Sequence, residues 1–429
     1  MGGVSMEWKH YKMDELIEEI SMGPFGSDVK KEFYVDNGVP ILNGSNLQGF
    51  KLKEDCFGYL TKEKADSLKK CNAHRGDIIV THRGTLGQIV YVPVNSKYDR
   101  YVISQSQFRF RCKADLVDVQ YLVYYFHTRE GQYKILANAS QVGVPALARA
   151  TSTFRLIDIK LPPLDDQRRI ASILSSLDRK IELNNKINAD LEEMAQAIFK
   201  NWFVDFEPFK DGKFVDSELG MIPEGWKVSQ IADIPHILET GKRPKGGAVE
   251  KGIPSVGAEH VKGMCAYDYS KTKYINCEFA TKLKTGKING YELMIYKDGG
   301  KPGYFIPNFS IFGEGYPFEN CYLNEHVFKL DFNGNKEFNI FCYFFFKTEQ
   351  IMSYFNAQGA KAAIPGINKK DVENIYIFSP DNESVIKFGE FAYPLFKQML
   401  KNAIENRTLS LLRDTLLPRL MSGELEVPE

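Results

Sequence analysis

An internal repeat constrains the fold of this 429-residue chain more than any other feature of its sequence. A tryptophan opens each copy, at Trp8 and at Trp226, and the run at 39–42 (VPIL) recurs at 253–256 (IPSV). The run at 77–87 (DIIVTHRGTLG) returns more loosely at 292–303 (ELMIYKDGGKPG). The repeat predicts two similar units rather than a solenoid, which needs three or more short units. Two such units predict a twofold-like protein that acts at two related sites.

Composition narrows the class of protein. Hydrophobic residues make up 43% and charged residues 26% of the chain, as in a globular protein with an ample core. Lys and Arg total 55, and so do Asp and Glu, which excludes a polycation that binds nucleic acid over its whole surface. A nucleic-acid face would therefore be a local patch with modest non-specific affinity.

The sequence also predicts where the protein works. No apolar run approaches the roughly 20 residues of a membrane span, and no signal-peptide pattern stands at the start. The seven cysteines are never spaced as C-x-x-C, which is typical of reduced thiols. We therefore expect a cytoplasmic protein with no membrane contact.

The order of local patterns predicts an α+β fold in which each copy is a β-rich unit followed by a long helix. Short β-rich runs at 78–80, 88–92 and 107–111 are separated by turns, and a helix is expected at 117–136. Pro162-Pro163 ends the first β-rich unit. The predicted boundaries are 6–162 and 211–380 for the β-rich units, the second with its linker, and 163–210 and 381–425 for the helices.

The two long helical stretches share a heptad pattern. Asn184 and Asn188 in the first match Asn402 and Asn406 in the second. A buried asparagine in a helical seam costs stability and fixes the register, so the match predicts that the helices pack as an antiparallel coiled coil. The alternative is two unrelated amphipathic helices whose asparagines face water. The predicted seam residues are Leu174, Leu177, Ile181, Asn184, Asn188, Leu191, Leu395, Met399, Asn402, Asn406, Leu409 and Leu416.

Catalytic motifs are not found. The chain contains neither an N-P-P-Y-like run nor the glycine-rich methyl-donor loop that a DNA methyltransferase needs. The glycine-rich run 297–303 has the wrong spacing for a phosphate loop, and the histidines form no i,i+4 metal pair. Pro380-Asp381 with Glu383 and Lys387 has the wrong spacing for a nuclease core. We expect no catalytic residue, metal or cofactor in this chain, which leaves recognition as its chemistry.

The first copy carries hydrogen-bonding side chains on loops between strands. An arginine there suits phosphates or guanine edges, and a glutamine suits adenine in the major groove. The alternatives are a plain hairpin turn with a solvated arginine, and an ordinary strand edge. The candidate DNA-binding residues of this copy are His82, Arg83, Thr85, Ser104, Gln105, Gln107 and Arg149.

The second copy carries its candidates on comparable loops. Residues 240–247 (TGKRPKGG) form the most basic loop of the chain and suit contact with a phosphate backbone. As a bare charge run, this loop has the alternative of being merely solvated. The candidates of this copy are Lys242, Arg243, Lys245, Lys297, Lys301, Tyr304, Lys361, Lys369 and Lys370.

Several helical motifs resemble those of one known family. They are 161–167 (LPPLDDQ), 170–178 (IASILSSLD), 180–185 (KIELNN), 191–199 (LEEMAQAIF) and 411–425 (LLRDTLLPRLMSGEL). With the two-copy layout, the whole chain resembles the specificity subunit of a Type I restriction-modification system. The second copy departs most at 381–391, where the proline-rich lead and the glutamine of the first copy are missing.

The resemblance implies two target-recognition domains, 6–162 and 211–380, each reading one half of a bipartite, asymmetric double-stranded DNA site. It implies that the helices set the gap and dock two methyltransferase subunits, which supply S-adenosylmethionine chemistry. A restriction and translocase subunit would supply the chemistry of ATP and Mg²⁺. The chain itself would catalyse nothing.

Helix geometry is consistent with these implications. A helix of about 30 residues is about 45 Å long, and twofold readers of DNA space their half-sites about one helical turn apart. One competing class is a non-catalytic two-module interaction protein on a coiled-coil strut. Another is a degenerate methyltransferase or nuclease.

Overall fold

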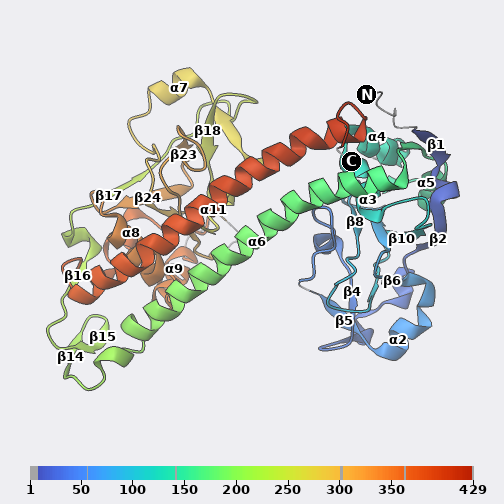
Figure 1. The fold of residues 1–429 in the computed structure, drawn as a ribbon. Helices are drawn as coiled ribbons and strands as arrows, with labels where there is room; N and C mark the ends of the chain where they lie inside the picture. Colours follow the sequence, from blue (N-terminus) through green and yellow to red (C-terminus); the bar gives the residue numbers. More distant parts are fainter. Residues whose placement is uncertain (1–7, 56, 141–142, 300–302, 362–363, 428–429) are drawn as a thin grey trace. The chain divides into compact units, whose positions relative to one another are not determined.

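The computed structural model describes residues 8–55, 57–140, 143–299, 303–361 and 364–427 (Figure 1). It contains two compact units, each with one copy of the repeat. Unit 1 comprises Met1–Arg179 with Leu409–Glu429, and unit 2 comprises Lys180–Thr408. Both mix helices and strands, which confirms the predicted α+β class. The ranges given above for the target-recognition domains stay a prediction, since compactness alone does not identify them.

Unit 1 is built mainly from short strands. They are β1 (Lys9–Lys12), β2 (Ile17–Met22), β3 (Tyr34–Val35), β4 (Val39–Ile41), β5 (Gly58–Leu60), β6 (Asn72–His74), β7 (Ile78–Thr81), β8 (Ile89–Tyr91), β9 (Arg100–Val102), β10 (Gln107–Cys112), β11 (Ala139–Ser140), β12 (Ala146–Leu147) and β13 (Asp158–Leu161). Its helices are α1 (Met13–Leu16), α2 (Lys62–Ser67), α3 (Val119–His127), α4 (Arg129–Leu136), α5 (Ala150–Arg155) and the first part of α6 (Leu164–Phe203).

Unit 2 has a similar set of elements. Its strands are β14 (Phe214–Ser217), β15 (Gly220–Pro223), β16 (Val228–Gln230), β17 (Ile237–Thr240), β18 (Ile253–Val256), β19 (Gly263–Met264), β20 (Lys273–Ile275), β21 (Leu293–Tyr296), β22 (Phe309–Ile311), β23 (Tyr322–Leu323), β24 (Val327–Asp331) and β25 (Tyr376–Phe378). Its helices are the rest of α6 from Lys180 onward, α7 (Cys277–Thr281), α8 (Lys336–Phe346), α9 (Glu349–Gly359), α10 (Lys369–Glu373) and most of α11 (Glu383–Met421).

The sheet topology contains the repeat that the sequence predicts. The antiparallel order β2-β10-β7-β8 in unit 1 recurs as β17-β24-β21-β22 in unit 2. Strand β4 pairs antiparallel with β5 and parallel with β9, and β18 does the same with β20 and β23. The pair β1–β13 likewise recurs as β16–β25. Because the strand pairs of unit 1 recur in unit 2, both copies of the repeat have the same topology.

The prediction of a single helix at 117–136 is wrong, because the chain forms the two helices α3 and α4 there. The backbone of Thr128 is extended, with ψ of 162°, which ends α3. Its hydroxyl accepts a hydrogen bond from the amide of Gly131 at 3.1 Å and so caps α4. A Cβ at Gly131 would lie 2.3 Å from the carbonyl oxygen of Tyr125, so only glycine permits this close turn.

The core of unit 2 is rich in phenylalanine. Helix α8, with the sequence KEFNIFCYFFF, begins where the side chain of Asn335 accepts a hydrogen bond from the amide of Phe338 at 3.0 Å. Apolar residues lie on all sides of this helix, and nearly all of it is buried. A helix that is apolar all round belongs in a protein interior, and α8 packs there beside β21 and β22.

The asparagines of the long helices lie in contact within unit 2. Asn184 donates to the Oδ1 atom of Asn406 at 2.9 Å, and Asn402 donates to the Oδ1 atom of Asn188 at 2.8 Å. The partner in α11 moves back along the chain as α6 advances, so the two helices run antiparallel. Asn184 and Asn402 are buried, so these two do not face water, and the pairing fixes the register. Among the other predicted seam residues, Leu174 and Met399 are buried, while those that are half-buried are Leu177, Ile181, Leu191, Leu395, Leu409 and Leu416.

The last part of α11 belongs to unit 1. Leu417, Leu420 and Met421 are buried in the same core cluster as the strands β7 and β10. Arg413 donates to Asp178 of α6 at 2.7 Å, and the hydroxyl of Tyr124 donates to the same carboxylate. Residues from the last part of α11 therefore complete the hydrophobic core of unit 1, which is built mainly from residues before 180. None of the helices in the described ranges combines the length and apolar character of a membrane crossing.

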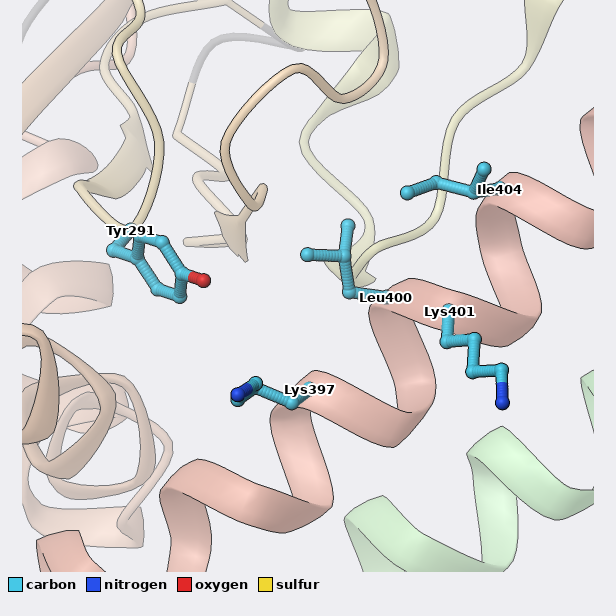
Figure 2. Close-up of a pocket in the computed structure, with 5 residues that line it drawn as sticks. All are labelled: Tyr291, Lys397, Leu400, Lys401 and Ile404. Carbon is cyan, nitrogen blue, oxygen red and sulfur yellow. The ribbon is translucent and has the colours of Figure 1, made fainter.

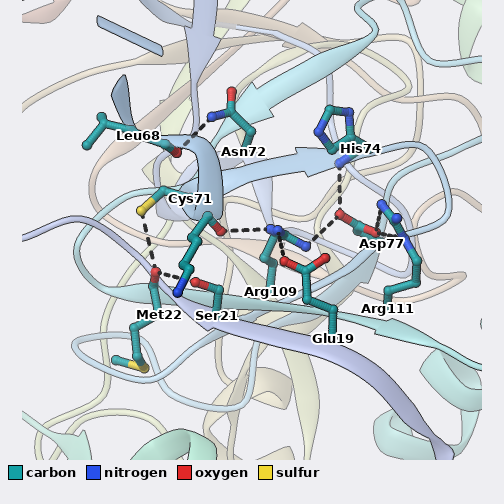
Figure 3. A network of polar contacts seen from close by, with 11 residues as sticks. Glu19, Ser21, Met22, Leu68, Cys71, Asn72, His74, Asp77, Arg109 and Arg111 are labelled. Carbon is teal, nitrogen blue, oxygen red and sulfur yellow. Dashed lines mark hydrogen bonds and ion pairs between the residues drawn. The ribbon is translucent and has the colours of Figure 1, made fainter. Parts of the chain in front are cut away.

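A buried ion network supports the central sheet of unit 1 (Figure 3). The guanidinium of Arg109, with 4% of its side chain exposed, lies 3.3 Å from the carboxylate of Asp77, which is fully buried. The same guanidinium lies 2.6 Å from Glu19, and Arg111 lies 2.8 Å from Asp77. Because each buried charge has a partner, the network joins β2, β7 and β10 without an uncompensated charge.

Unit 2 contains the equivalent network. Lys329 of β24, with 7% of its side chain exposed, lies 2.8 Å from Glu239 and 3.9 Å from Glu292. The carboxylate of Glu292 also accepts the amide hydrogens of Asn289 and Gly290. Buried charges thus recur at matched places of the two sheets.

The network of unit 1 predicts a dependence of stability on acid. The hydrogen bond from Arg109 holds the pKa of Glu19 below its ordinary value of 4.5. A depressed pKa contributes stability above the pKa of the unfolded chain, and this contribution disappears as pH falls through the lower folded value. We expect Glu19→Gln to reduce the loss of stability below pH 4.5. Urea denaturation of both proteins at pH values between 7 and 3 measures this, and parallel curves would contradict it.

Candidate functional site

Unit 1 holds its loops together by backbone hydrogen bonds at the end of β7. The amide of Leu147 donates to the carbonyl of His82 at 2.8 Å, and the amide of Gly84 donates to the carbonyl of Pro145 at 2.8 Å. The amide of His82 donates to the carbonyl of Ser106 at 2.9 Å. These bonds join three loops, 82–85, 104–106 and 145–149, which we call centre 1.

Unit 2 repeats this frame at the end of β21. The amide of Ile367 donates to the carbonyl of Lys297 at 2.8 Å, and that of Gly299 donates to Pro365 at 2.9 Å. The amide of Lys297 donates to the carbonyl of His326 at 2.9 Å. We call the loops 297–299, 324–326 and 365–370 centre 2.

The matched bonds establish which positions correspond in the two centres. Arg83 forms a backbone bridge with Ala146, and Asp298 forms the same bridge with Gly366. The corresponding pairs are therefore His82 with Lys297, Arg83 with Asp298, Gln105 with Glu325, and Ser106 with His326. One backbone frame thus carries two different sets of side chains.

Centre 1 presents unpaired donors to solvent. The side chains of Arg83, Thr85, Gln105 and Arg149 are exposed and, within the part of the chain described, form no hydrogen bond or ion pair. Arg149 has a φ of 47°, in the left-handed region that few arginines adopt. Backbone strain of this kind persists only where the surroundings hold it, so this loop has a defined shape.

His82 is the half-buried member of centre 1. Its Nε2 atom lies 3.2 Å from the carbonyl of Gln105. Burial lowers the pKa of His82, so the imidazole is neutral at pH 7. With Nε2–H donating to this carbonyl, Nδ1 remains as an acceptor.

Gln107 and Ser104 hydrogen-bond to each other and hold the 104–106 loop of centre 1. Gln107 is fully buried, and its Oε1 atom accepts the amide hydrogen of Ser104 at 2.8 Å. The hydroxyl of Ser104 lies 3.1 Å from that of Ser106. A buried amide cannot reach a ligand directly, because the alternation of strand residues turns Gln107 inward; its contact is with the loop that carries Gln105.

Centre 2 pairs its charges with one another. Asp298 accepts a hydrogen bond from Nδ1 of His326 and lies 3.1 Å from the ammonium of Lys297. Glu325 lies 3.3 Å from Nε2 of His326 and 3.8 Å from Arg243. The Oε2 atom of Glu325 is buried and has no hydrogen-bond donor among the described residues. Lys297 is thus tied to the protein, unlike Arg83 in centre 1.

Some of the other candidate side chains of unit 2 bond to the protein, and others are exposed without a polar partner among the described residues. Lys369 donates to the carbonyl of Leu238, and Lys361 donates to Gln358 at 2.8 Å. Within the described ranges, the exposed side chains that form no hydrogen bond or ion pair are those of Lys242, Lys245, Tyr304 and Lys370. Lys301 lies outside the described residues.

Asp298, Glu325 and His326 are not among the candidates that the sequence predicts. Asp298 directly follows Lys297, and Glu325-His326 precede β24 as Gln105-Ser106 precede β10. Aligning the two copies residue by residue around these strands would have found all three. Most of the candidates predicted for the second copy are basic, whereas Asp298 and Glu325 are acidic.

A shallow pocket of about 220 Å³ lies against α11 in unit 2 (Figure 2). Leu400, Ile404 and Lys397 line it from the helix, and the ring of Tyr291 faces them. Lys401 completes its rim. Large apolar side chains that are exposed on the two long helices are Leu183, Met194, Ile386, Ile404, Leu411 and Leu412. In the described ranges, no group of three or more His, Cys, Asp or Glu side chains gathers as a metal site.

Comparisons with known proteins agree with one another. A family model described as the Type I restriction modification DNA specificity domain matches residues 6–193. The chain is 28% identical to the Type I restriction enzyme MjaIX specificity subunit of Methanocaldococcus jannaschii, over 100% of this chain and 96% of that one. It is 25% identical to the HindI specificity subunit of Haemophilus influenzae, over 98% and 100%.

A solved structure has the same fold. The crystal structure of the S subunit of a Type I restriction-modification system from M. genitalium superposes with a TM-score of 0.55 and 17% identity. The match covers 97% of each chain. The likeness therefore extends over both copies of the repeat.

Proposed function

We infer that this chain, which belongs to the family of Type I restriction-modification specificity subunits, gives such a system its DNA sequence specificity. The matched family model, the full-length relatives and the shared fold support this function. The alternative of a two-module interaction protein gains no support, since the relatives described above are all specificity subunits.

One observation carries the finer proposal that each unit reads one half of a bipartite site. Centres 1 and 2 share a backbone hydrogen-bond frame but differ in the side chains at corresponding positions. Sequence is read by side chains that reach base edges, while phosphate contacts only fix position. Two equal frames with unequal side chains fit two different DNA words, and hence an asymmetric site. The exposed lysines of the 240–247 loop, Lys242 and Lys245, suit the phosphate contacts.

The chemistry of modification and restriction is proposed to lie on partner subunits. We expect this chain to contribute no catalytic residue, metal or cofactor, in keeping with the motifs that its sequence lacks. Methyltransferase subunits would supply S-adenosylmethionine, and a restriction and translocase subunit would supply ATP and Mg²⁺. We propose that the assembly works in the cytoplasm, in keeping with cysteines whose spacing is typical of reduced thiols.

The long helices offer the surface for the methyltransferase subunits. Leu183, Met194 and Leu411 are among the large apolar side chains that are exposed on these helices. Large apolar side chains left exposed on a helix can contact another protein. The pocket beside Ile404 adds a hollow that one apolar side chain of a partner can fill.

Exchange of one unit tests the modular reading of DNA. Residues 6–160 are replaced by the same unit of a relative, in the complex with its methyltransferase subunits. We expect only one half of the methylated site to change, because centre 2 is untouched. The methylated positions of a host genome give the result. Exchange of 211–380 is the matched control and should change only the other half.

A change in both halves after either exchange would contradict the modular proposal. The donor unit must also accept Leu417, Leu420 and Met421, which pack into the core of unit 1. A chimaera that fails to fold is therefore repeated with the donor's own residues 409–429.

An insertion in α6 tests whether the helices set the gap between the half-sites. Four residues after Asn185 add about one turn, or about 6 Å. They also displace Asn188 from Asn402 while leaving Asn184 opposite Asn406. We expect the non-specific gap to grow by roughly one or two base pairs, at about 3.4 Å each, with both words unchanged. Mapping methylated sites decides it, and an unchanged gap at full activity would refute the ruler role.

A further inference from the structure

We propose that centre 2 reads a base pair through an exocyclic amino group in the major groove, with Asp298 and Glu325 as the acceptors. The proposal rests on the proposed function and adds the chemical class of the base edge. It also adds two specificity-determining residues that are acidic, although the surroundings of DNA favour basic ones.

The backbone frames of centres 1 and 2 correspond position by position. Asp298 stands where centre 1 has Arg83, and Glu325 stands where it has Gln105. The backbone on either side makes the same hydrogen bonds, so each side chain leaves its loop from the same place. At the position of Asp298, the change from arginine reverses the charge and replaces a donor by an acceptor.

A carboxylate that faces DNA affects the binding free energy in two ways. Phosphates repel a carboxylate, so an acidic residue there destabilises binding unless it meets a donor. In the major groove the donors on base edges are the amino groups of cytosine N4 and adenine N6. Arg83, in contrast, offers only donors, which suit the O6 and N7 acceptors of guanine.

Neighbouring side chains of the protein offset part of the charge of these carboxylates. Lys297 lies 3.1 Å from Asp298 and Arg243 lies 3.8 Å from Glu325, so part of the charge of each carboxylate is neutralised before DNA arrives. The Oε2 atom of Glu325 lacks a donor among the described residues, although the side chain as a whole is 30% exposed. Rotation of this side chain brings a free acceptor to the surface, and an amino group satisfies it.

The test uses the chain assembled with its methyltransferase subunits and duplexes that carry its methylated site. Each adenine of the half-site read by unit 2 is replaced in turn by purine, which lacks the amino group. Each cytosine is replaced by 2-pyrimidinone, which lacks it too. We expect one replacement to weaken binding by roughly 5- to 150-fold. Its identity tells adenine from cytosine.

Protein variants complete the test. Glu325→Ala and Asp298→Ala should bind the normal and the altered duplex almost equally. The control is Glu278→Ala, which removes an exposed carboxylate of unit 2 paired only with Lys282 and should behave like the wild type. If a variant fails to fold, the duplex replacements on the wild-type complex still decide the question.

Two negative results have different meanings. A wild-type complex that does not distinguish its methylated site from a scrambled duplex would overturn the proposed function itself. A complex that distinguishes them, yet tolerates every amino-group replacement in this half-site, would overturn only the role of Asp298 and Glu325. The same holds if both variants keep full discrimination.

Discussion

Truncation after Thr408 is expected to unfold unit 1 and leave unit 2 folded. The removed segment contributes Leu417, Leu420 and Met421 to the core of unit 1. Loss of each such side chain costs about 2–5 kcal/mol, and a whole domain is stable by only about 5–15 kcal/mol. Hydrogen exchange measures the result: amides of β7 and β10 should lose protection while those of β21 and β24 keep it.

Single substitutions separate this packing effect from a general effect of shortening the chain. Leu420→Ala should lower the free energy of unfolding by about 2–5 kcal/mol, because the side chain is only 2% exposed. Leu411→Ala, on the same helix but 69% exposed, should change it by less than about 0.5 kcal/mol. Protected β7 and β10 amides in the truncated chain would contradict the account.

Replacement of Asp77 by alanine has the second large expected effect. Its fully buried carboxylate lies 3.3 Å from Arg109 and 2.8 Å from Arg111. Without it, the buried guanidinium of Arg109 keeps only Glu19 as a charged partner, and stranding a buried charge costs about 3–5 kcal/mol. Urea denaturation should show the loss as an earlier midpoint for unit 1.

Asp99→Ala is the matched control for this prediction. Asp99 lies 3.2 Å from Arg75, but 92% of its side chain is exposed. Exposed pairs contribute about 0–1 kcal/mol, so this variant should denature almost like the wild type. Equal effects of the two substitutions would mean that burial does not control the strength of these ion pairs.

Patterns that are local or repeated could be predicted from the sequence. The two-copy layout predicted two units of similar fold, and the sheet order of unit 1 does recur in unit 2. The matched asparagines predicted that the two helices pack antiparallel, because heptad position decides which residues face a partner helix. The strands at 78–80, 88–92 and 107–111 correspond to β7, β8 and β10.

Features that depend on distant residues could not be predicted. The network of Glu19, Asp77 and Arg109 forms only when three strands far apart in sequence take their register. Gln107 carries the right chemistry for DNA, yet the strand register buries it. Which candidates contact bases stays a prediction.

The division of unit 1 between the two ends of the chain sets the order of events during synthesis. Its first segment, up to Arg179, leaves the ribosome before all of unit 2, and its last segment, from Leu409, follows afterwards. At about 5–20 residues per second, residues 180–408 take roughly 10–50 s to make. During that time the apolar surface that will cover Leu417 and Leu420 stays open to the cell. Unit 2 can meanwhile fold to completion. Unit 1, whose synthesis begins first, therefore finishes folding after unit 2.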